Sequence, residues 1–468
     1  MKVTQIGHAS MLVEAGPLKI LSDPWWRGPC FGSQWWIYPD PRTDLVDYRG
    51  TDFLYISHGH HDHLHPPTLR LFARSAKVLV SAHLDIAPAI EALGFEVVRV
   101  SSDAPVSLGH GVECWIWPTH GDDSLCVVRH GREVCVNVND ALHSAPAAVQ
   151  DAITGRLKAG FGRIDYLFCG YGIASHFPNC YDVPGRDGPR TTAKRQHYFN
   201  GMWAKIVHAL EPKLAFPFAA DVALLDEELF FANEPTHNSE RPTDLFLELH
   251  PNSATTVVDI APGFSAQDGT VLNDVRRRPL SSARLRDERA DAVQRANRKG
   301  RVDAAEIDDL ADLVRANIRT VVDYLREYRG DYTFTIEFRD ALSKIVISKR
   351  GGELDVESRE DVSGLDPDVR YVTRAPYLKM SLTQQYGDEV LFVGSGGIFH
   401  LRSRATAEAN VQRELRVILT RHDSPVRSRY GTSSAGVFRL KQFAKKLLGR
   451  REDDLYDLGS WIEFESTS

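Results

Sequence analysis

Short apolar runs of strand length alternate with longer amphipathic runs over residues 1–250. The short runs are rich in β-branched and aromatic residues and end near Gly, Pro, Asp or Asn, a pattern that predicts β-strands. Three runs have helical spacing instead, at 68–74, 84–93 and 193–210. This order of elements predicts an α/β sandwich, in which helices cover two sheets. The predicted strands lie at 3–13, 53–56, 77–80, 96–100, 112–117, 125–128, 134–138 and 166–169.

The chain changes character after residue 250. Residues 251–303 contain scattered prolines and three consecutive arginines at 276–278, and we interpret them as a connecting segment with a solvated helix. Apolar residues then recur every three or four positions from Ile307 to Leu325, as in an amphipathic helix. Residues 304–468 are therefore predicted to form a second, smaller α+β domain. Its other predicted elements are strands at 332–338, 345–348 and 390–393, and a basic amphipathic helix at 437–451 that either docks on the domain or lies on a membrane surface.

The composition is that of an ordinary soluble protein, with 43% apolar and 25% charged residues. The net charge of -7 gives no support to nucleic-acid binding, which favours a basic face. No apolar run approaches the roughly 20 residues of a membrane span, and the N-terminus has no long apolar segment typical of a signal peptide. The six cysteines form no Cys-x-x-Cys pair, so we expect reduced thiols and a cytoplasmic location.

The strongest chemical signal follows directly after the predicted strand 53–56. Four metal-ligating side chains, His58, His60, Asp62 and His63, fall within six residues there. A loop that leaves a buried strand can direct all four toward one point. Imidazoles suit zinc and iron, and a carboxylate favours a second, more open metal position. We therefore predict a metal centre, with a histidine-rich surface loop as the alternative.

The His-x-His-x-Asp-His spacing resembles the motif of the metallo-β-lactamase superfamily. The resemblance implies an αββα sandwich and a site for two metal ions. It implies that one metal takes a third histidine, His120, and that Asp140 bridges the two metals. An ordinary loop histidine and a turn cap are the respective alternatives. The implied ligands are therefore His58, His60, Asp62, His63, His120 and Asp140, with Asp62 and Asp140 expected to act in catalysis.

The last ligand of the superfamily pattern is open in this sequence. The segment 214–218, where the resemblance implies one more histidine, contains none. Asp221 is our choice for this position. His237, His176 or an open coordination position are the alternatives. We also expect Asp23 to orient one of the ligand histidines by a hydrogen bond, or else to be a simple turn residue before Pro24.

The flanking sequence narrows the resemblance. The run from Asp23 to Pro29, the pair Trp35-Trp36, and residues 55–58 and 210–218 resemble the metal-binding domain of CMP-N-acetylneuraminate hydroxylase, over about residues 1–240. Those hydroxylases also carry a Rieske domain, which requires paired Cys-x-His motifs that this sequence lacks. Electrons are therefore expected from a separate reductase. A carboxylate at 221 would also resemble the metallo-β-lactamase-fold diiron hydroxylases of antibiotic biosynthesis, including the diterpenoid pathways.

Two enzymatic hypotheses follow. The first is a non-haem diiron monooxygenase that uses two Fe ions, O2 and external electrons to hydroxylate a C–H bond of a small organic substrate, either terpenoid-like or linked to CoA or a carrier. The second is a dizinc hydrolase, with two Zn ions, of an ester, thioester, amide or phosphodiester. A non-catalytic binding protein on the same fold is a third hypothesis. Metal identity and O2 dependence separate the first two.

Two further features leave alternatives open. Trp25 and Trp26 either wall an apolar substrate pocket beside the metals or belong to the core. The domain 304–468 faintly resembles a sterol-carrier-like fold, which implies that it holds an apolar or thioester-linked substrate. Alternatively, the domain only packs against its neighbours and supports a homodimer.

Overall fold

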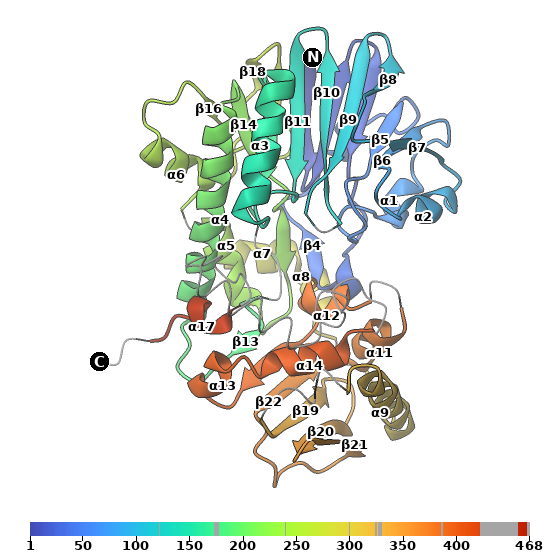
Figure 1. The fold of residues 1–468 in the computed structure, drawn as a ribbon, viewed down its shortest axis with the longest axis vertical. Coiled ribbons are helices and arrows are strands. Elements are labelled where there is room, and N and C mark those ends of the chain that lie inside the picture. The colour runs from blue at the N-terminus through green and yellow to red at the C-terminus, as the bar shows by residue number, and fades with distance from the viewer. Residues whose placement is uncertain are drawn as a thin grey trace. The chain divides into compact units, whose positions relative to one another are not determined.

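The computed structural model describes residues 1–120, 122–172, 177–238, 240–298, 300–322, 325, 330–384, 387–421 and 457–465. The chain divides into two compact units (Figure 1). The first unit contains residues 1–173, 193–224 and 233–285, and the second contains 174–192, 225–232 and 286–468. The division therefore differs from the sequence prediction, which placed the boundaries at 250 and 303. The helix predicted at 437–451 lies outside the described residues.

The first unit is built around two sheets. The predicted strand 3–13 is in fact a hairpin of two strands, because the chain turns at His8, whose φ is 41°. Strands β3, β5, β6 and β7 run parallel to one another. The first sheet has the order β18-β17-β1-β2-β3-β5-β6-β7, with the bounds β1 (Lys2–Gly7), β2 (Ser10–Ala15), β3 (Leu18–Ser22), β5 (Phe53–Tyr55), β6 (Lys77–Ser81), β7 (Glu96–Val100), β17 (Ser265–Gln267) and β18 (Thr270–Asn273).

The second sheet has the order β16-β14-β12-β11-β10-β9-β8. Its strands β10 and β11 form the predicted hairpin around Gly131, whose φ of 61° suits the tight turn. Strands β11, β12, β14 and β16 are parallel. The bounds are β8 (Val106–Gly109), β9 (Val112–Pro118), β10 (Ser124–His130), β11 (Glu133–Asn139), β12 (Tyr166–Gly170), β14 (Leu214–Phe218) and β16 (Thr256–Val257), and a separate ribbon pairs β4 (Trp35–Ile37) with β15 (Val222–Leu224).

The alternation of side chains along the strands produces two separate cores. Cys126 and Val128 of β10 belong to the core that also contains residues of the first sheet, such as Leu79. Their neighbours Leu125 and Val127 belong to a second core, formed with the outer helices. Successive residues of a strand point to opposite faces, so one strand serves both cores. The result is the predicted sandwich, in which two sheets face each other and helices cover the outside.

The helices cover the outer faces of the sheets. Leu157, Trp203 and Phe246, from three different helices, pack on the second sheet, and Figure 1 shows α1 and α2 beside β5, β6 and β7. The helix predicted at 84–93 ends before Gly94, which has a φ of 88°. The bounds are α1 (Pro66–Leu69), α2 (Ala87–Glu91), α3 (Ala147–Phe161), α4 (Gly188–Leu210), α5 (Asn233–Asn238), α6 (Pro242–Leu249) and α7 (Ser282–Glu288), with 3-10 turns η1 (Phe31–Ser33), η2 (Thr43–Leu45) and η3 (Phe230–Ala232).

Two sequence predictions about secondary structure need correction. The expected connecting segment 251–303 supplies β16, β17 and β18, because its short apolar stretches pair with β14 and β1. The expected strand 390–393 is helical instead, at α12 (Glu389–Phe392). A four-residue apolar run fits a buried helical turn as well as a strand, so periodicity could not decide between them.

The second unit is an α+β structure around a six-stranded sheet. The sheet has the order β13-β23-β22-β19-β20-β21, and the described helix α9 packs against β20 and β21. Within the described residues, no helix has both the length and the apolar character needed to cross a membrane. The bounds are β13 (Tyr181–Asp182), β19 (Tyr332–Phe338), β20 (Lys344–Arg350), β21 (Glu353–Arg359), β22 (Val369–Thr373), β23 (Ile398–Leu401), α8 (Ala290–Ala296), α9 (Ala304–Arg319), α11 (Ala375–Thr383), α13 (Arg404–Glu408), α14 (Gln412–Leu419) and α17 (Leu458–Trp461).

Candidate metal centre

The histidine motif occupies the loop that leaves the carboxyl end of β5. The loop folds tightly, since the backbone N–H groups of His63 and Leu64 both donate to the carbonyl oxygen of His60, at 3.0 and 2.8 Å. The prolines at 66 and 67 then start α1 at once. His58, Asp62 and His63 are buried, with side-chain exposures of 2%, 5% and 0%. Burial of so many ionisable groups in one short loop requires a compensating charge or ligand.

The second sheet adds Asp140 to the motif. Asp140 follows β11, and the preceding Asn139 adopts a φ of 49°, which turns the chain out of the sheet. The Oδ2 atom of Asp140 lies 3.4 Å from Nε2 of His63. His58, His63 and Asp140 form one group whose ligand atoms lie within 4.8 Å of each other. The carboxyl ends of β5 and β11 therefore meet at the site, the usual edge for ligands in parallel sheets.

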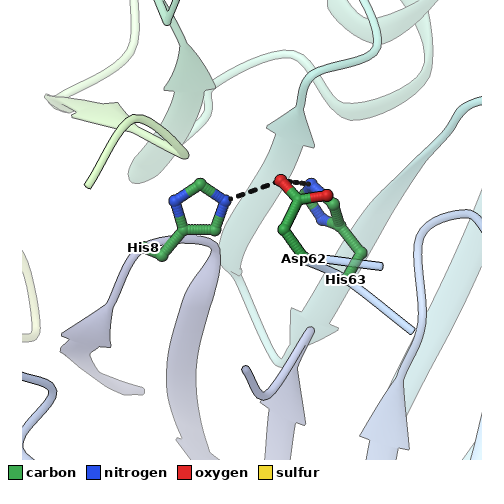
Figure 2. A group of neighbouring side chains, drawn as sticks. All are labelled: His8, Asp62 and His63. Carbon is green, nitrogen blue, oxygen red and sulfur yellow. Dashed lines mark hydrogen bonds and ion pairs between the residues drawn. The ribbon is translucent and has the colours of Figure 1, made fainter. Parts of the chain in front are cut away.

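A second group of three side chains shares His63. Asp62 lies between two imidazoles, with its Oδ2 atom 3.1 Å from Nε2 of His8 and 3.3 Å from Nε2 of His63 (Figure 2). These ligand atoms also lie within 4.8 Å of each other. His8 comes from the turn between β1 and β2 and was not among the residues predicted from the sequence. Its position 54 residues before Asp62 carries no spacing signal.

His63 is the electrostatic centre of both groups. Burial lowers the pKa of its imidazole, but the carboxylates of Asp62 and Asp140 outweigh burial and raise the pKa well above the ordinary value. Burial raises the pKa values of both carboxyl groups, but His63 together with the other neighbouring histidines outweighs burial and lowers them. In the metal-free protein a proton on His63 thus balances two carboxylates. A bound cation would take over that role and release the proton.

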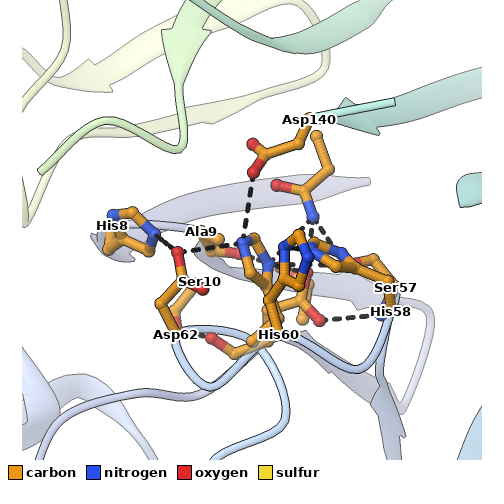
Figure 3. A network of polar contacts seen from close by, with 12 residues as sticks. His8, Ala9, Ser10, Ser57, His58, His60, Asp62 and Asp140 are labelled. Carbon is orange, nitrogen blue, oxygen red and sulfur yellow. Dashed lines mark hydrogen bonds and ion pairs between the residues drawn. The ribbon is translucent and has the colours of Figure 1, made fainter. Parts of the chain in front are cut away.

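The other nitrogen of His63 takes part in a network of polar contacts that also includes Ser57, which Figure 3 labels. Asp23 is fully buried, and its Oδ2 atom lies 3.2 Å from Nδ1 of His63. The amide of Asn139 donates to Oδ2 of Asp23 at 2.9 Å and to Oγ of Ser57 at 2.6 Å. The backbone N–H of Ser57 donates to the other oxygen of Asp23, at 2.8 Å. This arrangement holds Nδ1 of the ring and leaves Nε2 toward the two carboxylates, and the orienting role of Asp23 towards a metal ligand stays a prediction.

The first two histidines of the motif contact each other. Nε2 of His58 lies 2.8 Å from Nδ1 of His60. Burial, together with the neighbouring imidazoles, lowers the pKa of each to about 4. Both rings are therefore neutral near pH 7 and available as ligands without loss of a proton.

The donor set fits a metal. Two ligands about 2.1 Å from one metal lie roughly 3.0 to 3.4 Å apart in octahedral or tetrahedral geometry. The separations of 3.1, 3.3 and 3.4 Å around His63 fall in or near this range. The buried Oδ1 atom of Asp140 makes no hydrogen bond. Buried polar atoms normally find partners, so an unpartnered carboxylate oxygen at this position is what a metal site would produce.

Two more titratable side chains adjoin the site and were missed from the sequence. Oδ1 of Asp123 lies 3.5 Å from Nδ1 of His58, and burial raises the pKa of the Asp123 carboxyl to about 6. His143 is buried, its Nδ1 makes no hydrogen bond, and burial lowers its pKa. His143 follows Asp140 by three residues in the same turn. The position of Asp123 directly before β10 was the one available signal for it.

Besides His60, which contacts His58, three other candidate ligands lie outside both groups. His120 is exposed after the end of β9. Asp221 instead forms an ion pair with Arg277. His237 contacts the carbonyl oxygen of Val222, at 2.8 Å, and Nη1 of Arg277, at 3.1 Å. These contacts correct the choice of Asp221 or His237 as the last ligand, and His176 lies outside the described residues.

The tryptophans belong to the packed interior next to the site. Trp25 is fully buried, and its indole N–H donates to the carbonyl oxygen of Gly28 at 2.9 Å. The indole of Trp26 donates to Oγ of Ser10 at 3.1 Å. Trp25 also meets the ring of His8 edge-on, with 5.2 Å between centroids. Of the two interpretations left open by the sequence, burial favours the core.

Comparison with known proteins agrees with the fold and the motif. Residues 2–136 match the family described as "Beta-lactamase superfamily domain". The matched residues contain the motif from His58 to His63. A protein of Mycolicibacterium smegmatis described as a Rieske 2Fe-2S iron-sulfur protein is 30% identical over 200 residues, covering 40% of this chain and 37% of the relative.

Two further similarities concern hydroxylases. The cytidine monophosphate-N-acetylneuraminic acid hydroxylase of Danio rerio is 44% identical over 69 residues, which is 14% of this chain and 12% of the relative. The crystal structure of CmlA, a diiron beta-hydroxylase from Streptomyces venezuelae, covers 57% of this chain and 54% of its own, at 18% identity and a TM-score of 0.39. The chain spans 37% of the length of the Mycolicibacterium smegmatis relative and 12% of the length of the Danio rerio relative.

Proposed function

We propose that this protein is a non-haem diiron monooxygenase that hydroxylates a C–H bond of a small organic substrate. The observation that carries the proposal is the composition of the two ligand groups. Each group contains two histidines and one carboxylate, and the two groups share His63. Two histidines and one carboxylate with open positions are characteristic of non-haem iron oxygenases. Catalytic zinc sites also use this ligand set, so the choice of iron over zinc rests on the relatives.

The relatives support the same class. The segment similar to the Danio rerio enzyme belongs to a protein named as a hydroxylase, and the mycobacterial relative is named for an iron–sulfur centre. The first name indicates hydroxylation rather than hydrolysis, and the second indicates an iron–sulfur redox centre. The Rieske centre in the second name would supply electrons, and this chain has no paired Cys-x-His motif for one. We therefore propose that a separate reductase delivers the electrons.

The proposed reaction converts R–H, O2, two electrons and two protons into R–OH and water. Two irons bound at the site would supply the activation of O2. The protein's own groups then have three tasks. Asp62, His63 and Asp140 hold the metal positions, and Asp23 fixes the orientation of His63. Asp123, whose carboxyl group has a pKa of about 6 beside His58, is mostly ionised at neutral pH and can accept a proton close to the site.

The experiment uses the full chain in two metal forms. The metal-free protein is reconstituted anaerobically with either Fe(II) or Zn(II), and each form is then exposed to measured amounts of O2 with a chemical reductant. The proposal predicts that the iron form consumes O2 and the zinc form does not. Candidate substrates are then screened for compounds that increase O2 consumption, with hydroxylated product detected by mass spectrometry and the oxygen traced with ¹⁸O2.

A matched pair of variants tests whether the consumption occurs at this site. Asp140→Asn removes the charged ligand and should abolish O2 consumption, whereas Asp151→Asn changes an exposed residue of α3 and should leave it unchanged. Equal consumption by both variants would show that iron reacts elsewhere. If the zinc form instead cleaves ester, thioester or phosphodiester probes while the iron form is inert towards O2, the protein is a dizinc hydrolase and the proposal fails.

A further inference from the structure

We propose that His8 is a metal ligand and occupies the coordination position that the sequence left open. This inference rests on the proposed metal centre but not on the identity of the metal. The expected candidates, Asp221 and His237, are engaged by Arg277. The structure instead brings His8 to the free side of Asp62, opposite His63 (Figure 2).

The distances support coordination by His8. Its Nε2 atom lies 3.1 Å from Oδ2 of Asp62, which in turn lies 3.3 Å from Nε2 of His63. Each of these two separations is the spacing of neighbouring ligands around one cation at ordinary metal–ligand distances of about 2.1 Å. The group of His8, Asp62 and His63 would give that metal two imidazoles and one carboxylate.

The surroundings of His8 are built to hold its ring in place. The side chain is 3% exposed, and its Nδ1 atom makes no hydrogen bond. The ring is packed edge-on against Trp25. The backbone carbonyl oxygen of His8 accepts from the amide of Gln5 at 3.3 Å and from the N–H of Ala219 at 3.4 Å. An exposed turn histidine would need none of these contacts.

The backbone at His8 also indicates a function. Its φ of 41° is in the left-handed region, which costs a non-glycine residue of order 1 kcal/mol. Glycine would relieve this strain in a simple hairpin turn. A histidine retained there places an imidazole directly over Asp62, and strained residues of this kind concentrate at functional sites.

The test measures metal binding, which does not depend on catalysis. The metal-free full chain is titrated with Co(II), and the bound ions are counted by elemental analysis and by the visible absorption of the bound Co(II). The wild type should bind two ions. His8→Ala should still bind one ion tightly but should weaken the second by at least tenfold. His61→Ala is the matched control, since His61 belongs to the same loop but packs on Phe31 and lies outside both ligand groups.

His8→Gln distinguishes a ligand from a residue that only positions Asp62. Glutamine can donate a hydrogen bond to Asp62 but is a poor metal ligand. If His8 coordinates, His8→Gln should bind the second Co(II) as weakly as His8→Ala and should lose one coupled imidazole nitrogen in pulsed EPR of the Cu(II)-loaded protein. If His8→Gln restores wild-type binding, or if His8→Ala binds two ions with unchanged affinity, the proposal is wrong. A protein that binds two zinc ions through His8 but never reacts with O2 would uphold this inference and refute the proposed function.

Discussion

Asp221 and Arg277 form a buried ion pair. From the sequence alone, Asp221 could be either a metal ligand or the partner of a buried arginine. A carboxylate near a missing histidine suggested a ligand, yet its position relative to Arg277 depends on the pairing of a segment 56 residues away. Nothing in the local sequence reveals that pairing. His8 shows the converse, because a histidine in a hairpin turn is unremarkable until the fold brings it onto Asp62. The local motif from His58 to His63 was predictable because its ligands lie within six residues of one another.

The corrected role of Asp221 gives a prediction. In Asp221→Ala, the buried Arg277 loses its shortest ion pair and keeps only a 4.0 Å contact with Asp259 and the contact with His237. Removing one partner of a buried ion pair costs about 3 kcal/mol. We therefore expect a lower free energy of unfolding in urea, with the number of bound metal ions unchanged. Loss of one metal ion with unchanged stability would restore Asp221 as a ligand. Asp274→Ala removes an exposed partner of Arg276 and should leave both quantities within error of the wild type.

At the scale of elements, the strands of the first unit were predicted more accurately than its helices. Strand 96–100 was predicted to the residue, and the hairpin of β10 and β11 was located correctly. The alternation of β-branched residues with turn residues carries this information. Helix α3 was missed and the helix at 68–74 was misplaced, because both have short or weakly amphipathic apolar faces. The segment 251–285 was misjudged because its strands are two to four residues long and depend on partners distant in the sequence.

The end of β11 offers a prediction about preorganisation. The amide of Asn139, at the end of the second sheet, donates hydrogen bonds to Asp23 and Ser57 beside the first sheet. These are the residues that contact Nδ1 of His63. Asn139→Ala should lower the affinity for metal by about 10- to 100-fold, as is typical when the partners of metal ligands are lost. Competition with a chromophoric chelator measures this affinity. Asn252→Ala, at an exposed loop position of the same unit, is the control, and an unchanged affinity in Asn139→Ala would show that the network does not support the site.

At the scale of the whole molecule, the sequence predicted two parts but not how the chain divides between them. Residues 174–192 and 225–232 belong to the second unit although residues of the first unit precede and follow them. A prediction that cuts the sequence into consecutive domains cannot assign these two inserted segments to the second unit, since their composition differs little from that of their neighbours. The role of the second unit and any self-association stay predictions, as do the substrate and the redox partner.

The location of the metal centre in the first unit predicts unequal effects of metal removal. A ligand at 1,000 times its dissociation constant stabilises the folded state by about 4 kcal/mol. Chelation should therefore increase hydrogen exchange in residues 1–172 while leaving the six-stranded sheet of the second unit unchanged. Exchange measured peptide by peptide with mass spectrometry checks this. Equal deprotection of both units would contradict a centre confined to the first.

The most direct test of the central claim is the metal content of the protein purified from iron-supplemented cells, together with its visible spectrum before and after anaerobic reduction. The account predicts close to two irons per chain and an absorption band that disappears on reduction. Close to two zinc ions, with no band and no change on reduction, would contradict it and identify the site as that of a hydrolase.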